Sequence, residues 1–272
     1  MKKTYTILFF FTTIFLMNCS TAQKYNDIIP EHQTFTLQSK YVNEARVINV
    51  WLPTNYKSTT DSFPVLYMPD GGLKEDFPHI ANTIAELIQA KKIKPIILVG
   101  IENTQRRRDL TGFTEVNKDK EIAPVVGGSE NFRNFIQQEL IPEINKQYRT
   151  TYEKGIIGES LAGLFVTETF LLYPNMFSFY IAFDPSLWWN NHYLVQTAKE
   201  HLATPYTDKK TFWFAGSNAK DIYTYTKQLE QILKEENKAN LTWNYSNESK
   251  EKHNTIFRAT KEKAITWAIS EK

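Results

Sequence analysis

Five short runs of apolar residues in the body of the chain most constrain what it can fold into. Each run lacks the alternation of polar and apolar residues that a strand with one solvent-exposed face shows. Continuous apolar runs of this length are typical of strands buried on both faces, as in a parallel sheet covered by helices. The runs lie at residues 65–68, 95–101, 155–158, 179–183 and 212–215.

Two segments near the start of the chain differ from these runs. Residues 34–38 and 46–52 alternate polar and apolar side chains at period two, as half-buried edge strands do. A period-two beginning followed by continuous apolar runs predicts antiparallel strands at the N-terminal side of a mostly parallel sheet.

Three further segments have helical periodicity. Apolar side chains recur at three- and four-residue spacing in residues 131–144, 221–234 and 255–269, with Pro142 expected to kink the first of them. Alternating strands and helices predict an α/β fold, with a mostly parallel central sheet and helices on both faces. We expect one domain over residues 27–272, with its ligand at the carboxyl ends of the strands.

The first 22 residues predict a signal peptide that is no part of the fold. Two lysines precede an apolar run at residues 7–17, which has the length of a signal-peptide core and is too short to span a bilayer. The chain is either cleaved after Ala22 or lipidated at Cys19, since the residues around Cys19 resemble a bacterial lipobox; a cysteine without a role is the third alternative. We expect an exported protein, periplasmic or anchored to the outer membrane through lipidated Cys19.

Charge and cysteine content exclude other classes. Without the signal peptide the chain has 30 basic and 30 acidic residues, and its one basic stretch is residues 106–108. This balance gives no reason to expect a nucleic acid as partner. The segment from Arg106 to Asp109 either binds an anionic substrate or forms a solvated loop with a structural ion pair. Cys19 is the only cysteine, so the mature fold has no disulfide.

The sharpest motif is a strand–serine–helix junction at residues 155–165. Gly158-Glu159-Ser160-Leu161-Ala162 is close to the Gly-x-Ser-x-Gly pattern of a nucleophile elbow, with Ala162 at the second glycine. In such an elbow a tight turn strains the serine backbone and points its oxygen out of the sheet. We predict that Ser160 is the nucleophile; a serine that only caps the helix is the structural alternative.

A serine hydroxyl needs an adjacent base, which in this fold follows the nucleophile and the acid in the chain. Three histidines follow Ser160. His253 lies in a polar loop between the strand-like residues 241–245 and the last predicted helix, where the fold places its base. His192 and His201 lie on a predicted helix and are expected at the surface. We therefore predict that His253 is the base.

The acid that orients His253 has three alternatives. Asp221 is the only acidic residue in the loop after residues 212–215 and is the first choice, although it could instead stabilise the start of the next helix. Asp184, directly after residues 179–183, is the second candidate, because some hydrolases draw their acid from that position. The third is a Ser160–His253 dyad without an acid.

The oxyanion hole and the substrate site are predicted from neighbouring residues. An oxyanion hole needs two backbone N–H donors. We expect Leu161 and Gly71 to supply them, with an ordinary turn as the alternative for Gly71. We expect Asp184, Trp188 and Trp189 to line the substrate site, where one ring could stack on a sugar or aromatic acyl group; a core aromatic pair is the alternative.

Five stretches of the chain, taken together, resemble the putative esterase (esterase D-like) family of α/β-hydrolases, which includes siderophore, feruloyl and acetyl-carbohydrate esterases. Ala162 and Asp184 depart from this family, which often has glycine and serine there. The resemblance covers nearly the whole mature chain. The matching stretches are residues 64–72, 99–103, 106–111, 132–148 and 158–189.

The resemblance implies hydrolysis of a carboxylic ester, small or linked to a carbohydrate, through an acyl-enzyme. It calls for neither a metal ion nor a cofactor. Two other functions stay open: an acyltransferase on the same serine and histidine, as in the family's mycolyltransferases, and a lipid-anchored binding protein with an inert site.

Overall fold

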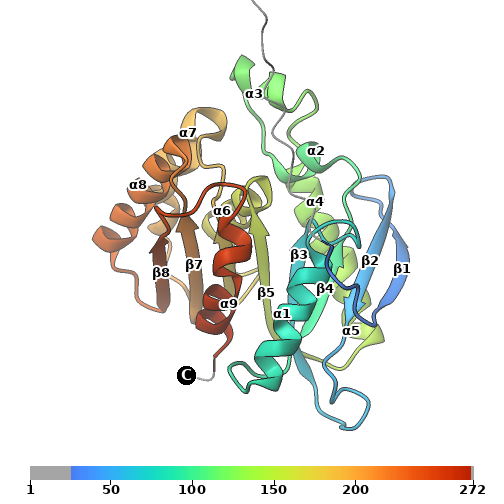
Figure 1. Ribbon diagram of the computed structural model, residues 1–272. Helices are drawn as coiled ribbons and strands as arrows, with labels where there is room; N and C mark the ends of the chain where they lie inside the picture. The colour runs from blue at the N-terminus through green and yellow to red at the C-terminus, as the bar shows by residue number, and fades with distance from the viewer. Residues whose placement is uncertain (1–25, 271–272) are drawn as a thin grey trace, which may run out of the picture.

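The computed structural model describes residues 26–270, which form a mixed sheet of eight strands with helices on both faces (Figure 1). Cys19 and the predicted cleavage site after Ala22 lie outside the described residues. The strands are β1 (Gln33–Gln38), β2 (Ala45–Trp51), β3 (Phe63–Pro69), β4 (Ile97–Ile101), β5 (Thr150–Glu159), β6 (Phe179–Phe183), β7 (Lys210–Gly216) and β8 (Leu241–Asn247).

The sheet has the order β1-β2-β4-β3-β5-β6-β7-β8. β2 is antiparallel to both β1 and β4, and every other neighbouring pair is parallel. The predicted class, a mostly parallel sheet with antiparallel N-terminal strands, is therefore confirmed.

The helices are α1 (Phe77–Gln89), α2 (Arg106–Leu110), α3 (Asn117–Ile122), α4 (Ser129–Phe135), the π-helix η1 (Ile136–Leu140), α5 (Ile141–Gln147), α6 (Leu161–Leu172), α7 (Trp189–Leu202), α8 (Lys220–Glu236) and α9 (Ile256–Ile269). The three segments that the periodicity predicted overlap five of these helical elements, α4, η1, α5, α8 and α9, and the others lie outside those segments. The π-helix lies just before Pro142, which has no N–H to continue the α-helical ladder. Among the described residues no helix is long and apolar enough to cross a membrane.

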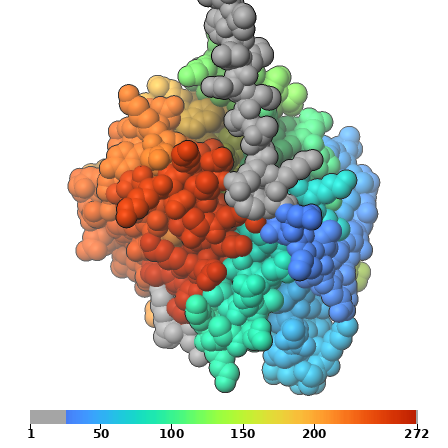
Figure 2. Space-filling model, viewed as in Figure 1, coloured from blue at the N-terminus to red at the C-terminus, as the bar shows by residue number. Residues whose placement is uncertain are grey.

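Two apolar cores, one on each face, explain the continuous apolar runs. Successive residues of β3 point to opposite faces, so Leu66 packs with α1 and α9 while Tyr67 packs on the side of α4 and α6. Both side chains are fully buried. In the space-filling view α9 and α1 cover the sheet on the viewed face (Figure 2). Because β3, β5, β6 and β7 are parallel, their carboxyl ends meet at one edge.

Candidate active site

Ser160 stands between β5 and α6 in a strained turn. Its backbone has φ 59° and ψ −117°, outside the regions that a non-glycine residue normally adopts. Its N–H donates to Phe183 O at 3.0 Å, and its carbonyl accepts the first bond of α6, from Leu164 N at 2.8 Å. A Cβ on Gly158 would lie 2.7 Å from the Cβ of Ala162, so the absence of a side chain at Gly158 makes room for Ala162.

Three adjacent strands end in such turns. Asp70 follows β3, Ser160 follows β5 and Asp184 follows β6, and their φ angles are 58°, 59° and 44°. A positive φ re-aims the side chain of a non-glycine residue at a cost in backbone energy. The three polar side chains thus leave the sheet at the same edge.

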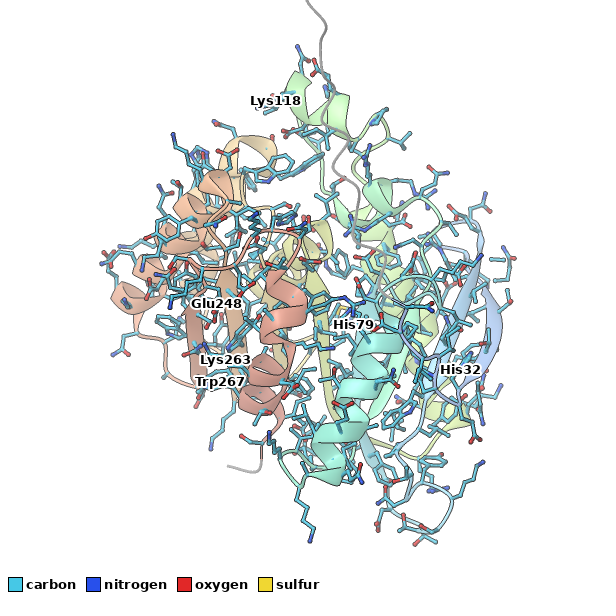
Figure 3. All side chains as sticks on the ribbon, viewed as in Figure 1. His32, His79, Lys118, Glu248, Lys263 and Trp267 are labelled. Carbon is cyan, nitrogen blue, oxygen red and sulfur yellow. The ribbon has the colours of Figure 1, made fainter. Side chains whose placement is uncertain are left out.

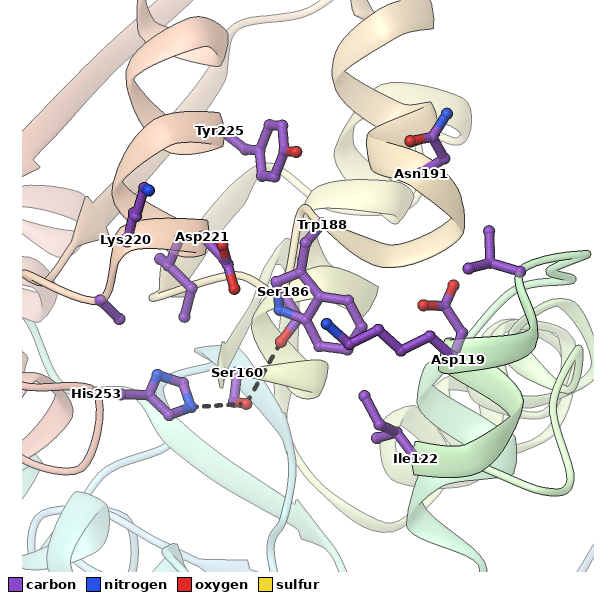
Figure 4. A pocket seen from close by; sticks show the side chains of 14 residues that line it. Asp119, Ile122, Ser160, Ser186, Trp188, Asn191, Lys220, Asp221, Tyr225 and His253 are labelled. Atoms are coloured by element: carbon purple, nitrogen blue, oxygen red, sulfur yellow. Dashed lines mark hydrogen bonds between the residues drawn. The ribbon is translucent and has the colours of Figure 1, made fainter.

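Ser160, His253 and Asp184 form one hydrogen-bonded row. His253 lies in the loop between β8 and α9, with its Nε2 3.1 Å from Ser160 Oγ (Figure 4). Its Nδ1 lies 2.8 Å from Asp184 Oδ2. In a neutral ring whose proton is on Nδ1, that nitrogen donates to the carboxylate and Nε2 can accept the serine proton. This geometry is that of a nucleophile, a base and an orienting acid.

Asp184, and not Asp221, is the carboxylate beside His253. Asp184 is fully buried, with Oδ1 accepting the Ser217 N–H at 2.5 Å and Oδ2 accepting the Ser217 hydroxyl at 2.6 Å. Asp184 therefore cannot contact the substrate, and the expectation that it lines the substrate site is wrong. Asp221 is exposed in the first turn of α8, and the described residues give it no hydrogen bond to His253. The expectation that Asp221 orients the base is wrong; the segment between β7 and α8 reaches the site through Ser217.

Of the two expected oxyanion donors, only Leu161 has a free N–H. Leu161 begins α6, ahead of its first intrahelical bond, and no acceptor for its N–H lies within the described residues. The Gly71 N–H donates to Ile101 O at 2.9 Å, so Gly71 is not the second donor. A Cβ on Gly71 would lie 2.3 Å from Gly100 Cα, and the glycine is needed because this loop packs against β4.

Arg106 fixes the same loop through Asp70. Its Nε and Nη2 donate to the two carboxylate oxygens of Asp70 at 2.6 and 2.7 Å. Asp109 is buried against Arg46 at 2.6 Å. Arg106 and Arg108 therefore form structural ion pairs, with Asp70 and with Asp109, as in the alternative to an anion site, but the segment is the helix α2 and not a solvated loop.

Glu159 lies beside Ser160 and has a perturbed carboxyl group. Burial, together with the nearby carboxylates of Asp76, Asp184 and Asp70, raises its pKa to about 8, although the Arg106 guanidinium acts in the opposite direction. No sequence pattern marks Glu159, because its perturbation depends on burial and on carboxylates from three other segments.

A pocket of about 730 Å³ opens above Ser160 and His253 (Figure 4). Trp188 and Tyr225 line it, which fits the expectation for Trp188. Trp189 instead is buried, donates its Nε1–H to Gly112 O at 3.1 Å and lines a separate cavity of about 340 Å³. Trp189 therefore belongs to the core alternative.

Two other histidines lie on α7, and a second serine lies beside Ser160. His192 and His201 lie on the expected helix, α7, but both are half-buried rather than at the surface. His192 stacks on Tyr225 with ring centroids 4.6 Å apart. Ser186, which the sequence reasoning did not consider, has its Oγ 3.5 Å from Ser160 Oγ. Within residues 26–270 no group of three or more His, Cys, Asp or Glu side chains is arranged to hold a metal ion.

The chain matches a family of esterases and is similar to a solved serine hydrolase. A family model described as putative esterase matches residues 39–268. The crystal structure of an IroE-like serine hydrolase from Shewanella oneidensis superposes with a TM-score of 0.80 and 25% identity, covering 87% of this chain and 79% of that one.

Two curated relatives match over shorter stretches. Ferri-bacillibactin esterase BesA of Bacillus subtilis is 30% identical over 154 residues, which are 49% of this chain and 51% of BesA. Apo-salmochelin esterase of Escherichia coli is 27% identical over 158 residues, 54% of this chain and 49% of that protein. The chain thus spans about half the length of these two relatives.

Proposed function

Because this chain belongs to the putative esterase family of α/β-hydrolases, we propose that it hydrolyses carboxylic esters through an acyl-enzyme formed on Ser160. The observation that carries the proposal is the hydrogen-bonded row Ser160–His253–Asp184, of which Ser160 and His253 line a pocket large enough for a small molecule. All three residues are placed by contacts within this chain.

The geometry supports a two-step mechanism. Ser160 Oγ attacks the ester carbonyl while His253 Nε2 takes its proton, and Asp184 holds the His253 ring with the other proton on Nδ1. The protonated His253 then gives its proton to the departing alcohol oxygen, leaving the acyl group on Ser160. Water, deprotonated by His253 in turn, attacks the acyl carbonyl and releases the acid.

Two backbone N–H groups would stabilise the negative oxygen of each tetrahedral intermediate. Leu161 supplies the first. For the second we propose Leu73, because the N–H groups of Gly71 and Gly72 donate to Ile101 O and to Glu75 Oε2, at 2.9 and 2.7 Å. The Leu73 N–H follows in the same loop and has no acceptor within the described residues.

A neutral small-molecule ester fits the pocket best. The formal charges of its lining side chains cancel, since Lys118 and Lys220 stand against Asp119 and Asp221. Trp188 offers an aromatic surface to a ring. The two curated relatives are named as esterases of ferri-bacillibactin and of apo-salmochelin, which supports a small-molecule substrate.

We also propose that the chain is exported and held at the membrane by lipidated Cys19. A bacterial lipoprotein carries several acyl chains, which anchor more firmly than one. The change Cys19→Ala should move the protein from the membrane fraction to the soluble fraction. Unchanged fractionation, or a mature N-terminus at Gln23, would contradict the anchor without affecting the esterase proposal.

The change Ser160→Ala tests the hydrolytic proposal. With p-nitrophenyl butyrate as substrate, kcat should fall by about 10³-fold or more, because the acyl-enzyme cannot form. A fluorophosphonate probe should label the wild-type protein on the peptide that contains Ser160 and should leave the variant unlabelled. Circular dichroism should show the same fold in both. Labelling of the variant, or turnover within about tenfold of wild type, would refute the assignment of Ser160 as the nucleophile.

A further inference from the structure

Asp119 is a buried carboxylate in the wall of the active-site pocket. It lies on α3, is 3% exposed, and faces His253 across the pocket (Figure 4). α3 stands beyond the carboxyl ends of the strands (Figure 3), and its Lys118 lines the same pocket. Neither the acyl-enzyme chemistry nor the oxyanion hole uses Asp119.

The two oxygens of Asp119 have different surroundings. Oδ2 accepts two hydrogen bonds of 2.8 Å, from the Thr114 hydroxyl and from the Asn190 N–H. Oδ1 has no hydrogen-bond partner within the described residues. Unlike the fully enclosed oxygens that lack a partner, Oδ1 keeps some accessible surface. The pocket is therefore the space into which Oδ1 is open.

The backbone that Asp119 holds is itself strained. Asn190, Asn191 and His192 have φ angles of 48°, 52° and 53°, three consecutive left-handed residues without a glycine. Such a stretch persists only where its surroundings hold it in place. Asp119 holds one end through the Asn190 N–H, and the stacking of His192 on Tyr225 holds the other. The carboxylate is thereby fixed, and Oδ1 cannot turn to a partner elsewhere.

A mostly buried carboxylate oxygen without a donor is costly unless a ligand supplies one. The cancelling charges of the pocket favour a neutral donor over a cation, and Trp188 lines the same pocket with an aromatic ring. We infer that Asp119 determines specificity by accepting, at Oδ1, a hydrogen bond from a hydroxyl group on a ring that packs against Trp188. This inference rests on the proposed esterase function. Such a ring comes either from a phenolic acyl group or from a sugar alcohol.

The change Asp119→Asn tests the inference. The amide oxygen can stay at the Oδ2 position, since the amide nitrogen there would face the Asn190 N–H, donor against donor. The amide nitrogen then replaces Oδ1, so an acceptor becomes a donor. Two matched ester pairs report the effect: methyl caffeate against methyl cinnamate, and monoacetylated methyl xyloside against cyclohexyl acetate. The first member of each pair carries hydroxyl groups.

In at least one pair, the wild type should favour the hydroxylated ester, and the variant should lower the ratio of the two kcat/KM values by about tenfold or more. A loss confined to the caffeate pair identifies a phenolic ring, and one confined to the xyloside pair identifies a sugar. Thr114→Val is the matched control, because it removes a bond to Oδ2 and leaves Oδ1 alone. It should change neither ratio by more than about twofold.

Three results would overturn the inference. The wild type could hydrolyse both members of each pair equally well, Asp119→Asn could leave both ratios unchanged, or Thr114→Val could lower the ratio as much as Asp119→Asn does. A wild-type protein inactive on all four esters and on p-nitrophenyl butyrate would refute the proposed function itself, and the inference with it.

Discussion

Replacing Asp184 by asparagine should disable the base without unfolding the protein, because the structure dictates which way the amide faces. Asp184 Oδ1 accepts the Ser217 backbone N–H at 2.5 Å, and this donor cannot turn away. The amide oxygen must therefore take that position. The amide nitrogen replaces Oδ2, where the Ser217 hydroxyl can rotate to accept from it and where His253 Nδ1 lies 2.8 Å from the present oxygen.

The consequence for His253 sets the magnitude. An amide nitrogen donates to Nδ1, so the ring proton moves to Nε2, which points at Ser160 Oγ at 3.1 Å. Nε2 then cannot accept the serine proton. In Ser–His–Asp hydrolases the wrong tautomer lowers kcat by about 10⁴-fold, which corresponds to about 5 kcal/mol of activation free energy. The loss of charge-assisted hydrogen bonds should lower the free energy of unfolding by only about 1–3 kcal/mol.

Steady-state hydrolysis of p-nitrophenyl butyrate measures this effect, with thermal melting followed by circular dichroism to show that the variant is folded. Asp221→Asn is the control, because Asp221 is exposed and has no bond to His253 within the described residues. Its kcat should stay within about threefold of wild type. If Asp184→Asn retains a tenth of the wild-type rate, or Asp221→Asn loses more than Asp184→Asn does, the assignment of the acid is refuted.

Two further predictions concern stability. Burial, together with nearby carboxylates, raises the pKa of Glu159 from 4.5 to about 8, so the folded chain keeps a proton that the unfolded chain releases, and stability falls as the pH rises through this range. Glu159→Gln should therefore have a higher Tm than wild type, and the difference in Tm should be larger at about pH 8 than at about pH 5. An equal difference at the two pH values would contradict the raised pKa of Glu159. Gly71→Ala should lower Tm by about 5 °C or more, because its Cβ would lie 2.3 Å from the backbone of Gly100 and Ile101; a Tm within about 1 °C of wild type would exclude that close approach.

The parts of the molecule that the sequence predicted correctly depend on local patterns. A residue such as Leu66 and its neighbour Tyr67 are both apolar because each face of the sheet is covered, and this information lies within one strand. The junction around Ser160 and the polar loop that holds His253 are equally local. Each needs only the strand before it and the helix after it.

The carboxylate that contacts His253 could not be predicted in the same way. Asp184 and Asp221 each follow a buried strand, β6 and β7, and these strands are neighbours in the sheet. The choice between them depends on where the loop of His253 meets the sheet edge, which is a property of the tertiary structure. One local signal did favour Asp184: it directly follows its strand, whereas Asp221 lies inside the first turn of the next helix.

The role of Gly71 was predicted wrongly, and α3 was not predicted, for other reasons. A glycine after a strand permits close approach of any neighbour, and the sequence does not distinguish an ester from the backbone of β4. α3 is a helix of six residues, too short to show an apolar period. Asp119 thus had no pattern to mark it, although its buried side chain forms part of the pocket.

The three left-handed turns at Asp70, Ser160 and Asp184 matter for anyone who engineers this protein. Each such residue holds about 1–3 kcal/mol of backbone strain, against a total stability of about 5–15 kcal/mol for a typical domain. Glycine at Ser160 or Asp184 would relax the backbone and remove a side chain of the proposed catalytic row in the same step. On that proposal, a directed-evolution screen that rewards heat resistance alone would enrich inactive variants at these positions. A library for thermostability should keep all three codons fixed and be scored on turnover as well as on melting.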